Sequence, residues 1–326
     1  MMAVPTFAPA TDTMSATAFF TPLDHEGVLA VVGADAAKLL QGQLTCNLNY
    51  LNAETSSLGA RCTPKGRMIS SFRIVPLGER FLLAMARELI EAQLADLKKF
   101  AAFFKAQLAD DSEAWARFGL SQGDGVLLTL GLDLAYEDGS VARSGELLAV
   151  RLRDGRAELW TPAGEAATLR QRLAAQLPEG SINDWLLAQV RAGIGQVFGA
   201  TRELFIPQML NLQALGGVSF KKGCYSGQEI VARMQYLGQL KRRLYRLRLA
   251  SGELPAAGAE LFSPVHGSAV GEVVLAARDG EACELLAVLQ NNAAEDGRLH
   301  LGSLEGPALQ LLELPYTIDN ERDAKR

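Results

Sequence analysis

The chain has 326 residues, 48% of them hydrophobic and 21% charged, and its formal net charge is -5. This composition is typical of a globular protein and excludes general disorder, while the length favours about two or three domains. The negative charge argues against direct, non-specific binding of nucleic acid, and no apolar run approaches the ~20 residues of a membrane span. We therefore expect a soluble, cytoplasmic protein.

The first half of the chain predicts strands alternating with helices. Residues 1–20 are rich in Pro, Thr, Ser and Ala, which predicts a disordered tail. A first unit over residues 21–118 follows, in which antiparallel strands and helices indicate an α+β layout. Its strands are expected at residues 28–32, 57–62, 68–75 and 81–86, and its helices at residues 36–44 and 88–104.

Residues 119–240 predict a second α+β unit. Strands are expected at residues 125–132, 147–152 and 157–161, and helices at residues 164–177 and 181–193. Residues 193–223 then carry several glycines and little periodicity. A long segment of this kind usually wraps a functional site.

From residue 241 to residue 318 the pattern changes to short strands without long helices between them. Tyr245, Leu247 and Leu249 alternate with arginines, and apolar runs follow at residues 269–276, 283–289 and 308–314. Short, regularly spaced strands predict a small β-barrel. Residues 319–326 are highly charged and predict a second loose tail.

Cysteine and histidine are few and scattered. The histidines are far apart, and no CxxC pair occurs among Cys46, Cys62, Cys224 and Cys283. Metal sites usually draw their ligands from short, recurrent spacings. The sequence therefore predicts no metal site, and free thiols in a reducing compartment.

The stretch from residue 220 to 229 concentrates reactive side chains. Ser226, followed three residues later by Glu229, matches a capping box for a helix that starts at Gly227. Cys224 would then precede the helix N-terminus, where the helix dipole and Lys222 favour the thiolate. We predict a functional Cys224 supported by Lys222; a glycine turn with a small buried cysteine is the plainer alternative.

Three further features have both a functional and a structural interpretation. Basic residues between positions 241 and 248 form either a phosphate-binding patch or the wet face of a strand, and their alternation favours the strand. The turn at residues 63–67 is either an anion site or an ordinary hairpin turn. Trp185 lies on an amphipathic helix, which taken alone favours a place in the core.

These motifs together resemble a known family. Lys222-Gly-Cys-Tyr-Ser-Gly-Gln-Glu229 is similar to the signature K-G-C-Y-x-G-Q-E of the YgfZ family of folate-binding proteins. The likeness runs in order from about residue 23 to residue 318. Further matching segments are at residues 33–35, 40–45, 64–66, 205–208, 211–213 and 216–217.

The resemblance implies the fold of the glycine-cleavage T-protein, with two ferredoxin-like α+β units and a C-terminal β-barrel around a folate-sized cavity. It implies tetrahydrofolate, or a one-carbon-loaded folate, as cofactor, and iron–sulfur proteins, including tRNA-modifying enzymes, as clients for assembly or repair. A redox thiol and a transient cluster ligand both remain open for the signature cysteine. The residues implied are Cys224 and Lys222 for the reactive site, Trp185 for stacking on the pterin, and Tyr225, Gln228 and Glu229 for further folate contacts.

Two departures from the related folds bear on activity. The T-protein carries paired aspartates where Ser70 and Ser71 stand, and a family-associated aromatic near the chain start is replaced by Glu26 or Gly27. A hydroxyl cannot replace a carboxylate as an acid–base group near pH 7. An accessory protein that works through a thiol is therefore favoured, with a folate-dependent aminomethyltransferase and a non-catalytic folate sensor as alternatives.

Overall fold

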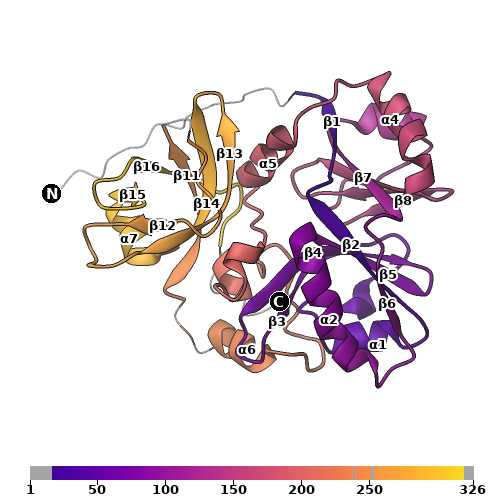
Figure 1. The fold of residues 1–326 in the computed structure, drawn as a ribbon, viewed down its shortest axis with the longest axis horizontal. Coiled ribbons are helices and arrows are strands. Elements are labelled where there is room, and N and C mark those ends of the chain that lie inside the picture. Colours follow the sequence, from indigo (N-terminus) through magenta and orange to yellow (C-terminus); the bar gives the residue numbers. More distant parts are fainter. Residues whose placement is uncertain (1–16, 237, 239, 251–252, 319–326) are drawn as a thin grey trace.

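The computed structural model describes residues 17–236, 238, 240–250 and 253–318. Two open sheets and one closed barrel form lobes around a common centre (Figure 1). Most of the predicted N-terminal tail and all of the tail predicted at residues 319–326 lie outside the described residues. None of the described helices is both long and apolar enough to cross a membrane.

The first lobe is a ferredoxin-like unit with one added strand. Its sheet has the order β3-β4-β5-β2-β6, in which β4, β5, β2 and β6 are the ferredoxin-like part and β3 is an extra edge. Helices α1 and α2 connect the strands, and all pairings are antiparallel. The elements are β2 (Glu26–Val32), α1 (Ala36–Gln41), β3 (Ser57–Cys62), β4 (Met68–Leu77), β5 (Arg80–Ala86), α2 (Ile90–Ala101) and β6 (Gln107–Asp110).

The second lobe repeats this order as β1-β7-β10-β9-β8, with its outer strand taken from the start of the chain. Strand β1 pairs with β7 in the position that β6 has beside β2. The elements are β1 (Phe19–Pro22), β7 (Trp115–Ser121), α3 (Asp124–Thr129), β8 (Val141–Ser144), β9 (Leu147–Arg151), β10 (Ala157–Pro162), α4 (Ala166–Ala174) and α5 (Ile182–Arg191).

This arrangement corrects three predictions. The tail predicted to residue 20 is too long, because Phe19 and Phe20 are buried in β1. The boundary predicted between residues 118 and 119 falls inside β7, which belongs wholly to the second sheet. The strand predicted at residues 125–132 is wrong: helix α3 occupies Asp124–Thr129, and it buries Val126 and Leu127. A short continuous apolar run fits either a strand or a buried helix.

The third lobe confirms the predicted C-terminal β-barrel. Its strands close in the order β11-β14-β13-β12-β15-β16, with β16 returning to β11. Closure leaves no free edge among the described strands of this lobe. The elements are β11 (Arg242–Leu249), β12 (Glu260–Phe262), β13 (Gly271–Asp279), β14 (Ala282–Gln290), α7 (Asn291–Asp296), β15 (Leu299–Leu301) and β16 (Ala308–Leu312).

Residues 193–223 cross the centre and join the lobes. They include the short helices η4 (Gly199–Thr201) and η5 (Pro207–Leu210), and they lead to α6 (Gln228–Tyr236). Phe205 and Leu210 are buried in one hydrophobic cluster with Phe72 of the first unit and Leu244 of the barrel. Helix α5 lies between the barrel and β1 (Figure 1). The weakly periodic segment is therefore the packed centre of the molecule.

Candidate functional site

Hydrogen bonds fix the signature stretch to the first unit at two points, the C-terminal end of α1 and the end of β3. The Ser226 amide donates to the Gly42 carbonyl over 3.2 Å, and its hydroxyl donates to the Cys62 carbonyl over 3.1 Å. The Gln228 side chain accepts from the Tyr225 amide over 3.2 Å, and helix α6 begins at Gln228. The capping box predicted for Ser226 with Glu229 is therefore wrong within the described residues. The Ser226 hydroxyl donates to the Cys62 carbonyl, and the Gln228 side chain accepts from the Tyr225 amide.

Lys222 is a buried side chain that links the signature to the first unit through hydrogen bonds. Its ammonium donates to the carbonyls of Leu44 and Cys46 over 2.5 and 2.8 Å, and it lies 4.9 Å from the Tyr225 ring centroid. Burial lowers the pKa of Lys222 to about 8. Its electrostatic support of Cys224 stays a prediction, because these contacts already account for the side chain.

The lowered pKa of Lys222 predicts a pH-dependent stability. Between pH 8 and an unfolded pKa of about 10.4, the unfolded chain binds more protons, so the free energy of unfolding rises with pH. Lys222→Met lacks this increase. Denaturant unfolding at pH 7.5, 9 and 10 should therefore show wild type gaining stability relative to the variant. A stability difference between wild type and Lys222→Met that stays constant over this pH range would contradict the assignment.

Cys224 differs from the other cysteines in its exposure. All four thiols are free, and Cys46, Cys62 and Cys283 are buried whereas Cys224 is exposed. Burial raises the pKa of Cys46 to about 11 and that of Cys62 to about 12. Only the Cys224 thiol is therefore open to a partner protein.

The remaining signature residues build the loop and do not line the cavity that holds Trp185. Tyr225 is buried, and this burial raises its pKa, whereas Glu229 is exposed at the start of α6. The roles of Tyr225, Gln228 and Glu229 as folate contacts stay predictions. In the described part of the chain, no group of three or more His, Cys, Asp or Glu side chains could hold a metal ion.

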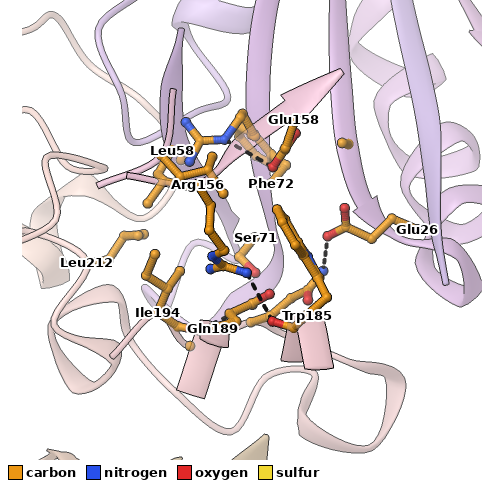
Figure 2. A pocket seen from close by; sticks show the side chains of 16 residues that line it. Glu26, Leu58, Ser71, Phe72, Arg156, Glu158, Trp185, Gln189, Ile194 and Leu212 are labelled. Atoms are coloured by element: carbon orange, nitrogen blue, oxygen red, sulfur yellow. Dashed lines mark hydrogen bonds and ion pairs between the residues drawn. The ribbon is translucent and has the colours of Figure 1, made fainter. Parts of the chain in front are cut away.

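A cavity of about 60 Å³ lies between the two ferredoxin-like units (Figure 2). Trp185 of α5, predicted to be the stacking residue, lies on its wall and is 3% exposed. The Arg156 guanidinium carbon is 4.0 Å from the ring centroid, and Arg156 donates to the Trp185 carbonyl over 3.0 Å. Gly119 of β7 lies so close that a Cβ there would come within 2.5 Å of the ring. Glycine at this position leaves room for the indole.

Four charged side chains line this cavity, and sequence reasoning missed most of them: Glu26, Arg73, Arg156 and Glu158. Arg117 does not line the cavity but pairs with two of them. Arg117 donates to Glu26 over 2.5 Å and to Glu158 over 2.6 Å, and it lies 4.3 Å from the Trp160 ring centroid. Burial acts to raise the pKa of Glu26, but the Arg117 charge holds it below its usual value. Glu26 is therefore ionised at neutral pH.

The two serines at the T-protein aspartate positions have structural partners. Ser71 lines the cavity and accepts from the Val197 amide over 2.8 Å, while Ser70 bonds the Gln93 side chain over 3.1 Å. Neither hydroxyl supplies an acid–base group.

The basic residues of β11 and the turn after β3 both have structural contacts. On β11, Arg246 pairs with Glu284 over 2.6 Å and Arg248 pairs with Asp279 over 2.9 Å, which supports the interpretation as a strand face. In the turn, a Cβ on Gly66 would come within 2.9 Å of Ile230 in α6. The turn thus packs against the signature helix, while Lys65 stays exposed.

Comparison with known proteins places this geometry in a family. No protein-family model matches the chain. The tRNA-modifying protein YgfZ of Escherichia fergusonii is 32% identical over 326 residues, covering 98% of this chain and 100% of the relative. Its namesake in Serratia proteamaculans is 34% identical over 307 residues, covering 92% of this chain and 93% of the relative.

A solved structure shows the same fold. The glycine cleavage system aminomethyltransferase T from Bartonella henselae aligns with a TM-score of 0.75 at 20% identity, covering 92% of this chain and 86% of that chain. This likeness supports the predicted T-protein fold. The identity and coverage of the two relatives show that the chain belongs to the family of the tRNA-modifying protein YgfZ.

Proposed function

We propose that the protein binds a tetrahydrofolate at Trp185 and, in the cytoplasm, supports assembly or repair of iron–sulfur proteins, including tRNA-modifying enzymes, through the Cys224 thiol. The observation that carries this proposal is the placement of the one exposed thiol on a loop fixed to the end of β3, a strand that also lines the cavity. Its relatives' name, tRNA-modifying protein, supports the link to tRNA modification.

Strand β3 connects the cavity with the loop that carries Cys224. Leu58 and Gly59 line the cavity, and Cys62 at the end of the same strand accepts the Ser226 hydrogen bond. From Gly59 to Cys62 the strand spans roughly 10 Å. A ligand in the cavity can therefore influence the loop that carries Cys224 through one rigid element.

The residues of the cavity suit a pterin, but the cavity must widen to admit one. Trp185 supplies an aromatic surface for an offset stack, which contributes about 0.5–1.5 kcal/mol beyond area burial. The cavity of about 60 Å³ is smaller than the roughly 300 Å³ or more of ligand pockets, so Arg156 must leave the Trp185 ring. Arg156 also lines a neighbouring groove of about 960 Å³, beside Arg153 and Arg191. This groove has room for the rest of the folate.

Aminomethyl transfer is the less favoured reaction. The hydroxyls of Ser70 and Ser71 hold structural hydrogen bonds, and the carboxylates of Glu26 and Glu158 are both paired with Arg117. The lowered pKa of Glu26 makes its carboxylate a poor proton donor at neutral pH. One exposed thiol without further ligands favours transient assistance over storage of a cluster.

Titration with tetrahydrofolate tests the binding site. Trp185→Phe should weaken binding by about two- to tenfold, because a smaller ring loses part of the stacking energy. Trp185→Ala should abolish binding, whereas Cys224→Ser should leave affinity unchanged. Isothermal titration calorimetry measures the affinities, with Trp115→Phe as a tryptophan control outside the cavity. Unchanged affinity in Trp185→Ala would refute the site.

A further inference from the structure

The cavity contains a buried hydrogen-bond acceptor without a partner. Gln196 is 5% exposed and lines the cavity, and its amide nitrogen donates to Glu26 Oε1 over 2.6 Å. Because a carboxylate only accepts, this bond fixes the orientation of the Gln196 amide. Its Oε1 atom then has no hydrogen-bond partner among the described residues. A buried acceptor left unpaired costs about 1–3 kcal/mol, so its place on a cavity wall indicates a missing donor.

Glu26 adds a second acceptor beside the first. One carboxylate oxygen accepts from Gln196 and the other accepts from Arg117 over 2.5 Å. Each oxygen of a carboxylate can accept about two hydrogen bonds, so both retain capacity toward the cavity that Glu26 lines. Figure 2 shows Glu26 on the cavity wall, with its hydrogen bond marked. Glu26 and Gln196 thus present adjacent acceptors close to Trp185.

We propose, on the basis of the folate function above, that Glu26 and Gln196 form the subsite that recognises the donor edge of the pterin. In a 2-amino-4-oxopteridine, the 2-amino group and the neighbouring ring N–H are donors on one edge of a flat ring. The two acceptors match that edge, while Trp185 faces the ring. A site built to bond such donors rejects an analogue that lacks them, because its own buried groups then stay unpaired.

The test compares tetrahydrofolate with an analogue that carries a methyl group in place of the 2-amino group. Wild type should bind tetrahydrofolate about 10- to 100-fold more tightly than the analogue, as expected for a hydrogen bond to a charged acceptor. Gln196→Met should lose about tenfold in tetrahydrofolate affinity and leave the analogue's affinity nearly unchanged. Glu26→Gln should reduce the ratio of the affinities for tetrahydrofolate and for the analogue at least as much as Gln196→Met does.

Controls separate binding from folding. Glu113→Gln makes the same chemical change at an exposed carboxylate that pairs with Arg87, and it should bind as wild type does. Glu26→Gln removes a partner of buried Arg117 and can therefore lower stability. Gln196→Met keeps that ion pair, so the subsite can still be tested if Glu26→Gln fails to fold. Thermal unfolding of each variant verifies the fold.

Each outcome has a distinct meaning. If wild type binds neither compound, the folate function fails, and the subsite fails with it. If wild type binds tetrahydrofolate but does not distinguish it from the analogue, the subsite is wrong while folate binding stands. Full discrimination retained in both Gln196→Met and Glu26→Gln would also overturn the assignment.

Discussion

Replacing Cys224 by serine is expected to leave the protein folded and to abolish its support of cluster-containing tRNA-modifying enzymes. The thiol is exposed, so its loss leaves no cavity in the core. The serine hydroxyl, however, is not deprotonated near neutral pH and cannot replace a thiolate as nucleophile or metal ligand. The measurement is the content of cluster-dependent modified nucleosides in bulk tRNA from a strain that lacks its own family member, complemented with each variant.

Thiol chemistry in vitro supplies the control for this prediction. Native wild-type protein should react with an aromatic disulfide reagent at one thiol, native Cys224→Ser at none, and denatured wild type at all four cysteines. Cys283→Ala removes a buried thiol of the barrel and should complement fully. Full complementation by Cys224→Ser would refute the working thiol. If Trp185→Ala then failed to complement, the folate-sensing function would be favoured.

Local sequence pattern predicted the elements whose own residues alternate or repeat with the period of a strand or a helix. The alternation of Tyr245, Leu247 and Leu249 correctly indicated a barrel strand, because one of its faces is buried. Strand β1 could not be predicted in this way. It pairs with β7, about a hundred residues later, so the segment that looks like a tail becomes buried only through a long-range contact.

The site likewise combines one local motif with contacts between segments far apart in the chain. The signature located Cys224 through a local motif, but the partners of Lys222 are carbonyls 178 and 176 residues earlier in the chain. Gln196 and Glu26 are separated by 170 residues, and nothing in either local sequence marks them as a pair. Only the packing of α5 and residues 193–223 against the first unit brings these groups to one cavity.

Gly227→Ala is expected to have the largest effect on stability among substitutions in the signature. Gly227 has φ +84°, and a Cβ there would lie 2.5 Å from the Thr63 carbonyl oxygen and 3.0 Å from the Cys62 Cβ. A left-handed conformation costs a non-glycine residue about 1–3 kcal/mol, and the backbone oxygen cannot move aside as a flexible side chain would. Denaturant unfolding should therefore show a loss of at least that size.

Gly223→Ala is the matched control, because it lies in the same loop without a positive φ and nothing is within 4 Å of its Cβ position. Its stability should stay within about 0.5 kcal/mol of wild type. Relief of the clash in Gly227→Ala requires the loop to move away from the first unit, which breaks the bond from the Ser226 hydroxyl to Cys62 and the bond from the Ser226 amide to Gly42. We therefore expect the amide of Ser226 to exchange hydrogen faster in Gly227→Ala than in Gly223→Ala. Equal stability and equal exchange in the two variants would show that the signature loop is not held against β3 as described.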